Sequence, residues 1–252
     1  MSYSAFARFQ EKGKEIVALG EKRGIPVRLI GAIAVRLHCD KHAHLLESMK
    51  RQISDIDVVT YSNFRSKIEG LLTELGYSPN ERFNAAHRTR HIYGDKNNSL
   101  IVDVFFDKLE MCHVIDFKDR LELDYPTITP TDILIEKVQI VEINEKDVKD
   151  IIVLLREHDV GHGEKEMINS KYIAKLLSNS WGFYYTSTTN LNKVKRSVET
   201  LDVLNEEDRR VVFQRIDKLL GVIEKEPKGF QWKMREKIGT KKKWYTDVCD
   251  QL

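Results

Sequence analysis

A strand that carries acidic residues at alternate positions constrains the fold of this chain more than any other feature. In Asp55-Ile56-Asp57-Val58-Val59, acidic and apolar residues alternate with a period of two, which is the pattern of a half-buried strand. Side chains two residues apart on a strand point to the same face, so the carboxylates of Asp55 and Asp57 emerge side by side. Two such charges repel each other unless a cation lies between them.

A third carboxylate extends this pattern. Asp103 lies within the apolar run Leu100 to Phe106, where burying an unpaired carboxylate is costly. A divalent metal removes the repulsion, and oxygen ligands with few protein partners suit Mg²⁺. If the strand of Asp103 lies next to that of Asp55 and Asp57, the three residues form a site for two metal ions. Surface strands also show alternating acids, so the pattern by itself leaves that alternative open.

A strand-turn-helix segment precedes the acidic strand. Val27 to Ile30 is a short apolar run, and Ala32 to Leu37 has helical character. Gly31 followed by the small Ala32 lets backbone amides at a helix N-terminus approach a phosphate group closely. A plain turn between a strand and a helix is the alternative.

The order of the predicted elements indicates an α+β protein. A helix is expected over residues 4–22, the exposed end of a helix followed by a loop over 40–52, a helix over 62–75 capped by Ser62 or Asn63, and paired strands over 91–106. Helices follow at 131–141, capped by Thr131, and at about 146–158, 166–179, 189–203 and 205–225. The 252 residues therefore favour a mixed β-sheet flanked by helices in domain 1–125, followed by an all-helical domain in 126–252.

Taken together, these residues resemble the nucleotidyltransferase superfamily, whose pattern is an apolar strand, Gly-Gly or Gly-Ser, a helix, D-x-D and a later strand Asp. More narrowly, Leu29 to His38 followed by Arg51 to Asp57 resembles the AbiEii/MenT-like branch, the nucleotidyltransferase toxins of type IV toxin-antitoxin systems. That branch carries a later Lys and a Lys-Asp-x-x-Asp helix, which Lys137 and the segment 146–150 match. The resemblance covers about residues 27–157.

The resemblance implies a Mg²⁺-dependent nucleotidyltransferase that moves a nucleoside monophosphate from a nucleoside triphosphate to a hydroxyl acceptor such as tRNA and releases pyrophosphate. The implied catalytic residues are Asp55, Asp57, Asp103 and Lys137, of which the three aspartates hold two Mg²⁺ ions. The implied nucleotide-binding residues are Gly31, Ala32, Ser54, Lys137, Asp147 and Asp150. A cognate antitoxin is an implied partner.

Two departures from the family pattern alter the expected contacts but remove no carboxylate. Ala32 replaces the second residue of the Gly-Gly or Gly-Ser pair, and Asn144 stands where the branch has an Arg. An active site with altered affinity is therefore expected. The main alternative is a catalytically inactive nucleotide- or RNA-binding module of the same fold, and a third is a toxin component whose role an antitoxin sets.

Basic residues concentrate near the C-terminus. Residues 225–243 carry eight Lys or Arg and two Glu, a net charge of +6, whereas the whole chain has a net charge of +2. Phe230, Trp232, Trp244 and Tyr245 lie among these charges, a mixture that suits contact with a nucleic-acid backbone and stacking on its bases. A solvated basic segment whose Trp residues dock on the domain is the alternative. A second acceptor-side patch, or a polar strand edge, is formed by Arg82, Arg88 and Arg90, with His87 and His91 nearby.

Several other chemistries are disfavoured. His38 and His42 have helical spacing but lack the Glu of an H-E-x-x-H zinc motif, and His158-Asp159 with His162 is expected in an interdomain loop. The P-loop and G-x-S-x-G motifs are absent from the sequence. Cys39, Cys112 and Cys249 are widely spaced and expected to be structural. No apolar run approaches the roughly 20 residues of a membrane span, so the protein is expected to be cytoplasmic, without a membrane partner.

Overall fold

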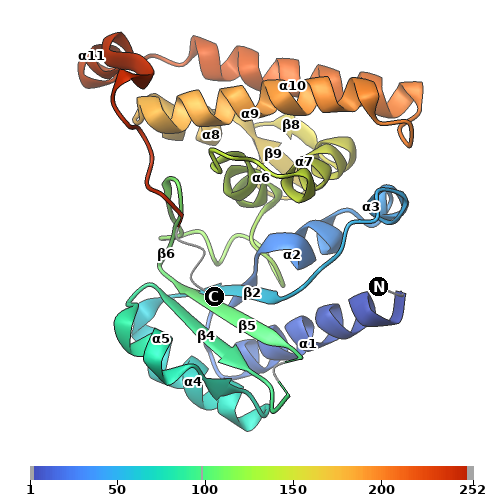
Figure 1. Cartoon of the computed structure of the whole chain (residues 1–252), viewed down its shortest axis with the longest axis vertical. Coiled ribbons are helices and arrows are strands. Elements are labelled where there is room, and N and C mark those ends of the chain that lie inside the picture. Colours follow the sequence, from blue (N-terminus) through green and yellow to red (C-terminus); the bar gives the residue numbers. More distant parts are fainter. Residues whose placement is uncertain (1–2, 98, 249–252) are drawn as a thin grey trace. The chain divides into compact units, whose positions relative to one another are not determined.

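The chain divides into two compact units. The computed structural model describes residues 3–97 and 99–248. The first unit comprises the described residues within 1–37, 52–110 and 114–128, and the second those within 38–51, 111–113 and 129–252. Figure 1 colours the chain along its sequence, from the blue N-terminal helix to the red C-terminal one. The division of the chain into domains 1–125 and 126–252 stays a prediction.

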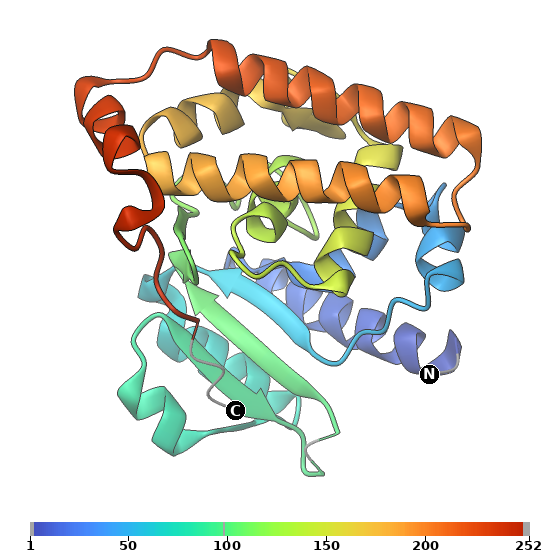
Figure 2. The same ribbon diagram turned by 45° about the horizontal axis from the view of Figure 1, so that its top comes forward.

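A mixed five-stranded sheet organises the first unit. Its strands lie in the order β1 (Arg28–Leu29), β2 (Ile56–Thr60), β5 (Ile101–Phe106), β4 (Arg90–Gly94) and β3 (Ser78–Pro79). Strands β2 and β5 are parallel and lie side by side in Figure 2, whereas the other neighbours are antiparallel. A parallel pair requires a crossover connection, and here the chain passes through two α-helices and the strands β3 and β4 between β2 and β5. The predicted α+β class is confirmed for this part of the chain.

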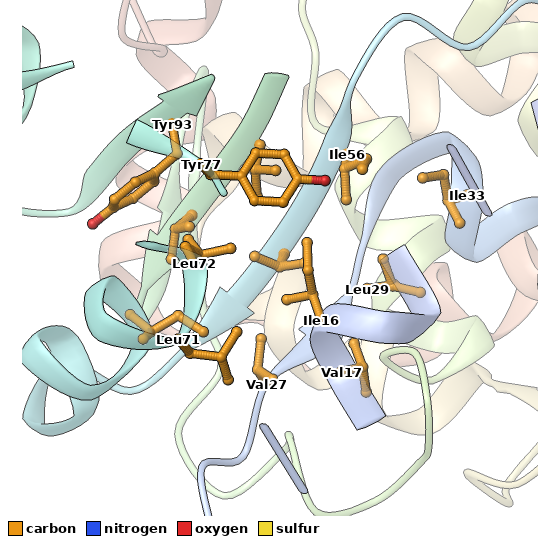
Figure 3. Close-up of a cluster of buried hydrophobic side chains, with 14 of the residues drawn as sticks. Ile16, Val17, Val27, Leu29, Ile33, Ile56, Leu71, Leu72, Tyr77 and Tyr93 are labelled. Atoms are coloured by element: carbon orange, nitrogen blue, oxygen red, sulfur yellow. The ribbon is translucent and has the colours of Figure 1, made fainter. Parts of the chain in front are cut away.

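One face of this sheet is covered by helices α1 (Tyr3–Lys22) and α4 (Arg65–Glu74). Ile56 and Val58 of β2 and Val102, Val104 and Phe106 of β5 belong to one buried apolar cluster. The helices supply Ile16, Val17, Ile68, Leu71 and Leu72 to the same cluster, part of which Figure 3 shows. Each such side chain contributes about 1.5–3 kcal/mol on burial. The strand register is thereby held, because a slip by one residue would turn acidic residues of β2 and β5 into this cluster.

The start of α4 differs from the prediction. Ser62–Phe64 form a 3-10 turn, η1, and the N-cap of α4 is Phe64, which makes no side-chain capping hydrogen bond. The predicted caps Ser62 and Asn63 are therefore wrong. The Ser62 amide N–H donates instead to Oδ1 of Asp107 at 2.9 Å, so a residue far along the chain provides the acceptor.

Shorter elements complete the first unit. Helix α5 (Glu81–Ala86) precedes β4, and the Asn80 side chain caps it by accepting the Phe83 N–H. Strand β6 (Lys108–Glu110) pairs with β7 (Val114–Asp116) as an antiparallel hairpin.

Helices dominate the second unit. They are α3 (Ala43–Ser48), α6 (Pro130–Val138), α7 (Glu145–Glu157), α8 (Ser170–Ser178), α9 (Trp181–Thr200), α10 (Glu206–Lys225) and α11 (Phe230–Ile238), followed by the 3-10 turn η2 (Gly239–Lys241). Helix α10 packs against α7, α8 and α9, and Figure 1 shows the long α9 and α10 running alongside each other. Polar side chains cap five of these helices by accepting the N–H three residues on: Thr129, Asn144, Asn169, Ser180 and Asn205.

Several predictions for the second unit are wrong in detail. The part expected to be wholly helical contains a two-stranded parallel sheet, β8 (Asp159–Gly161) and β9 (Met167–Asn169). Helix α3 lies within the segment 40–52, where the end of a helix and a loop were expected. Helix α8 starts at Ser170 and α9 at Trp181, rather than at 166 and 189. Thr129, not Thr131, caps α6, because Pro130 occupies the first helical position, where its missing N–H costs nothing.

Two further expectations concern membrane spans and cysteines. Within the described residues, no helix is long and apolar enough to cross a membrane. Cys39 and Cys112 are both buried, in agreement with a packing role. Cys249 lies outside the described residues.

Candidate active site

Three carboxylates converge on one face of the sheet in the first unit. Asp57 of β2 and Asp103 of β5 are direct partners in the parallel register, and Asp55 lies two residues before Asp57. One carboxylate oxygen from each residue lies within 4.8 Å of the others. Asp103 is buried, whereas Asp55 and Asp57 are partly exposed. The two strands are therefore adjacent, which is the condition for the predicted three-carboxylate site, and their acidic residues share a face.

The donor atoms of this acidic cluster, Asp55, Asp57 and Asp103, fit a hard divalent cation. All three offer carboxylate oxygens, the donors that Mg²⁺ prefers, and three protein ligands leave positions for water and phosphate oxygens. Their partial exposure gives a ligand access to Asp55 and Asp57. The arrangement can hold positive charge next to a phosphorylated substrate.

Gly31 brings the start of α2 (Gly31–His38) against this cluster. Its backbone is left-handed, with φ of +67°, and a Cβ atom added to it would lie 2.5 Å from Oδ2 of Asp57. The neighbouring Ile30 N–H donates to the backbone carbonyl of Asp57 at 3.0 Å. A glycine is therefore required here for both its backbone conformation and its lack of a side chain. The helix N-terminus, with its partial positive charge, lies beside a candidate cation and phosphate site.

Ala32, which follows the turn at Gly31, and Ser54, which precedes Asp55, have different surroundings. Ala32 packs against the apolar cluster of the first unit, which accounts for a methyl group at this departure from the family pattern. The Ser54 hydroxyl donates to Oδ1 of Asp55 at 3.1 Å. Ser54 thus contacts a candidate metal ligand, whereas a role of either residue in nucleotide binding stays a prediction.

Arg90 forms a bidentate ion pair with the most buried carboxylate of the cluster. Its Nε and Nη2 donate to Oδ1 and Oδ2 of Asp103 at 3.0 and 2.9 Å. Burial alone lowers the pKa of Arg90, but the hydrogen bond to Asp103 and the charges of Asp103, Asp57 and Asp55 raise it above its ordinary value. The guanidinium thus partly neutralises all three carboxylates. Each carboxylate oxygen can accept at two positions, and Arg90 uses one position on each oxygen of Asp103. The second position on each oxygen can still accept from a ligand.

Lys137 lies in a buried charged cluster of the second unit. Its Nζ is 3.4 Å from carboxylate oxygens of Glu136, Asp147 and Asp150. Arg51 donates from Nε and Nη2 to the two oxygens of Asp150, both at 2.8 Å. Burial lowers the pKa of Lys137, but the three carboxylates outweigh it and hold the pKa above its ordinary value, against the opposing charge of Arg51. Lys137 is therefore a cation at neutral pH.

Asn144, where the family branch has an Arg, has a structural contact. Its side-chain Oδ1 accepts the Asp147 N–H at 3.0 Å and caps α7. The capped helix start presents Asp147 and Asp150 toward Lys137. The resemblance to that branch thus predicts a missing cation at this position, whereas the local structure shows a helix cap.

Two residues of the predicted patch of Arg82, Arg88 and Arg90, with His87 and His91 nearby, point in opposite directions. Arg90 points to Asp103, while the next residue along β4, His91, is buried on the core face against the ring of Phe106. Burial lowers the pKa of His91, with Arg65 adding to the effect. Alternation along the strand separates the two neighbours, because successive side chains point to opposite faces.

The histidine tract is also divided. Helix α2 ends at His38, so His38 and His42 do not share a helical face. His42 contacts Glu157, with Nδ1 2.7 Å from Oε2, whereas Nδ1 of His38 is 3.7 Å from Oε1 of Glu166. His158, predicted to lie in an interdomain loop, instead caps the C-terminus of α7 within the second unit.

The aromatic residues of the basic C-terminal segment are mostly docked. Trp232 is buried and donates from Nε1 to the Leu177 carbonyl at 3.2 Å. Trp244 donates from Nε1 to Oγ1 of Thr186 at 3.1 Å. Phe230, in contrast, is 78% exposed. The two Trp residues therefore have the packing role of the alternative, whereas Phe230 is exposed and Tyr245 is partly exposed, so both can contact a ligand.

Sequence reasoning assigned no role to Arg51 and Glu166, and it placed Arg90 in an acceptor patch. Arg51 begins the segment Arg51 to Asp57, and its spacing of four residues from Asp55 carries no information about its partner Asp150. Glu166 has a left-handed backbone, with φ of +51°, which no local sequence pattern indicated.

Comparison with known proteins adds no relative. No protein-family model matches the chain, and no curated protein sequence matches it.

Proposed function

We propose that the chain is a Mg²⁺-dependent nucleotidyltransferase that moves a nucleoside monophosphate from a nucleoside triphosphate to a hydroxyl acceptor. The observation that carries this proposal is the convergence of Asp55, Asp57 and Asp103 beside the glycine that begins α2. The sheet is proposed to be of the nucleotidyltransferase type, on the strength of the family resemblance and of the parallel pairing of β2 with β5.

The three aspartates would hold the metal ions. When bound, Mg²⁺ supplies positive charge next to phosphate oxygens and lowers the pKa of a coordinated hydroxyl. The start of α2 orients a phosphate through its backbone amides, with Gly31 allowing close approach. Arg90 holds Asp103 in place and leaves acceptor positions on its oxygens.

The proposed reaction is an in-line displacement at the α-phosphorus. The acceptor oxygen forms a bond to that phosphorus while the bond to the oxygen bridging the α- and β-phosphates breaks, and pyrophosphate leaves. The hydroxyl proton passes to a nearby carboxylate or to water. The chain contributes positioning and charge rather than a covalent intermediate.

The residues of the second unit enter the proposal through the resemblance. Lys137 is proposed to neutralise triphosphate oxygens, with Asp147 and Asp150 orienting it or contacting the nucleotide. Its contacts with both carboxylates support the orienting role. An RNA acceptor such as tRNA is supported by the net charge of +6 over residues 225–243. A cognate antitoxin is proposed from the resemblance alone.

The ion pair of Arg90 with Asp103 favours a second candidate, a nucleotide- or RNA-binding module without activity. The guanidinium already places a positive charge where an active site needs a metal ion. In this candidate the chain binds a triphosphate or RNA with the same residues but transfers nothing.

Incubation of the chain with each labelled nucleoside triphosphate, Mg²⁺ and total RNA tests the proposal. Asp57→Asn should lower label incorporation by at least about 100-fold, since a metal ion supplies several kcal/mol of charge stabilisation. Asp202→Asn, at an exposed acid, is the matched control and should retain activity. Circular dichroism should show that both variants keep the fold.

The outcomes separate the candidates. Wild-type incorporation by Asp57→Asn would end the enzyme proposal. Binding of a triphosphate without incorporation into any acceptor would favour the binding module. Label found on the protein alone would identify the protein itself as the acceptor.

A further inference from the structure

Two imidazoles and a carboxylate meet in the second unit, in a cluster separate from the acidic one. His38 ends α2, His158 caps the C-terminus of α7, and Glu166 lies between β8 and β9. One ligand atom from each residue lies within 4.8 Å of the others. The two histidine rings are 5.5 Å apart and inclined by 78°. The proposed nucleotidyl transfer uses none of the three.

The separations in this cluster differ from those of a hydrogen-bonded ion pair. Nδ1 of His38 is 3.7 Å from Oε1 of Glu166, and Nδ1 of His158 is 3.7 Å from Oε2. Both values exceed the 2.7–3.2 Å of ordinary N–H···O hydrogen bonds. Ligand atoms around a tetrahedral zinc ion lie about 3.3–3.5 Å apart, from metal–ligand distances of about 2.0–2.2 Å. The two histidine–glutamate separations therefore exceed the zinc spacing by a few tenths of an ångström, and the third separation in the cluster lies within 4.8 Å.

The surroundings hold the two histidine side chains in place. The side chains of His38 and His158 are only 6% and 3% exposed, whereas that of Glu166 is 64% exposed. Nε2 of His158 is 3.1 Å from the His38 backbone carbonyl, the kind of contact that fixes the ring and its tautomer in metal sites. With the proton on Nε2, Nδ1 is the nitrogen that faces the Glu166 carboxylate. The exposed Glu166 can close the site by a side-chain movement.

The chain also holds the backbone that carries Glu166. The pairing of β8 with β9 closes the connection in which Glu166 lies. The Ser170 hydroxyl donates to the Gly161 carbonyl at 2.8 Å, and the Asn169 side chain donates to Oε1 of Glu164 at 2.9 Å. Glu166 itself has a left-handed backbone, uncommon for a residue other than glycine. Contacts at both ends of the connection between β8 and β9 therefore hold its backbone in one conformation.

The donor atoms of this cluster suit a transition metal. A neutral imidazole is the form of histidine that binds a metal. Nitrogen donors favour Zn²⁺ and related transition metals, whereas the oxygen-only acidic cluster of the first unit favours Mg²⁺.

We propose that His38, His158 and Glu166 bind Zn²⁺ through three protein ligands, with water in the fourth position. Such a site is independent of the acidic cluster and does not rest on nucleotidyl transfer. Three protein ligands with one open position are the arrangement found in zinc sites that bind a further ligand.

Metal binding to the untagged full chain tests the inference. After treatment with a chelator, the wild type should bind one equivalent of Zn²⁺ in competition with a chromophoric chelator, and bound Co²⁺ should show intense visible d–d absorption. His158→Ala should weaken Zn²⁺ binding by more than the roughly 10–100-fold caused by loss of an outer-shell partner. His44→Ala, at an exposed histidine near His38 in sequence, is the matched control and should bind as the wild type does.

Two further variants keep the test decisive. Glu166→Gln changes an exposed side chain, so it should fold and yet lose most of the Zn²⁺ affinity even if His158→Ala does not fold. Asp57→Asn should keep the Zn²⁺ affinity and the Co²⁺ spectrum, which separates this site from the acidic cluster. The inference is overturned if the wild type binds no Zn²⁺, or if Glu166→Gln binds it as tightly as the wild type.

Discussion

Replacing Gly31 by alanine tests the link between the start of α2 and the acidic cluster. The new Cβ atom would lie 2.5 Å from Oδ2 of Asp57, closer than the 3.0 Å that real Cβ contacts respect. The oxygen or the turn must therefore move by at least 0.5 Å, the difference between these two distances. Gly24 is the matched control, because its φ of +66° almost equals the +67° of Gly31 and nothing lies within 4 Å of its added Cβ.

The two substitutions share one cost and differ in another. A left-handed backbone costs a non-glycine residue about 1–2 kcal/mol, which for a chain of this size lowers Tm by about 2–8 °C. Gly24→Ala should show this loss alone. Gly31→Ala should show it together with displacement of Asp57, and misplacement of a catalytic group by about 1 Å costs about 100-fold in rate.

Calorimetric unfolding, Mn²⁺ titration and nucleotide incorporation measure the three effects. We expect Gly31→Ala to bind Mn²⁺ at least about 10-fold more weakly and to lose about 10–100-fold in incorporation, while Gly24→Ala retains both. Equal stability losses with unchanged Mn²⁺ affinity in both variants would refute the reasoning, since the contact with Asp57 would then have no effect on metal binding.

Three other predictions concern charged and titrating groups. Arg90→Ala should lower the Tm of the metal-free protein and raise Mn²⁺ affinity about fivefold or more, because the cation on Asp103 stabilises the carboxylates by at least about 1 kcal/mol. A Tm and an Mn²⁺ affinity equal to those of the wild type would contradict this. Lys137→Met should reduce the free energy of unfolding in urea by about 3–5 kcal/mol, because buried carboxylates lose their cation. Lys149→Met removes an i,i+4 ion pair and should reduce it by about 0.5 kcal/mol. Equal losses in the two variants would exclude the buried network. Burial lowers the pKa of His113 from 6.5 to about 4, so below pH 6.5 the unfolded chain takes up a proton that the folded chain takes up only near pH 4. Stability contributed by His113 is thus present above pH 6.5 and lost as pH falls toward 4, and Tm of His113→Asn should fall less than wild-type Tm between pH 7 and 4.5; parallel curves would contradict it.

The secondary structure around the acidic cluster was largely predictable. Alternation along 55–59 and the apolar run 100–106 reflect the two-residue period of a strand, a local property of the chain. The same period places Asp55 and Asp57 on one face before any pairing is known. Gly31 before a helical segment likewise indicates a turn that needs glycine, and here the structure adds the reason, its contact with Asp57.

The starts of several elements were less predictable. Ser62 and Thr131 are good capping residues, yet Ser62 turns its N–H to Asp107 and Thr129 caps α6. Strands β8 and β9 are three residues each, too short for a periodic signal, and each forms only because the other is adjacent.

The sequence by itself determined which strands carry carboxylates, which face they share and where a helix can start, because these follow from local periodicity and backbone preference. Only the tertiary structure decided that β2 lies parallel to β5, that Arg90 holds Asp103, and that Glu166 meets His38 and His158. The partners lie on different elements of the fold, and the side chains involved have no sequence pattern that identifies a partner. Their meeting depends on how the buried apolar faces pack, a property of the whole fold rather than of any one segment.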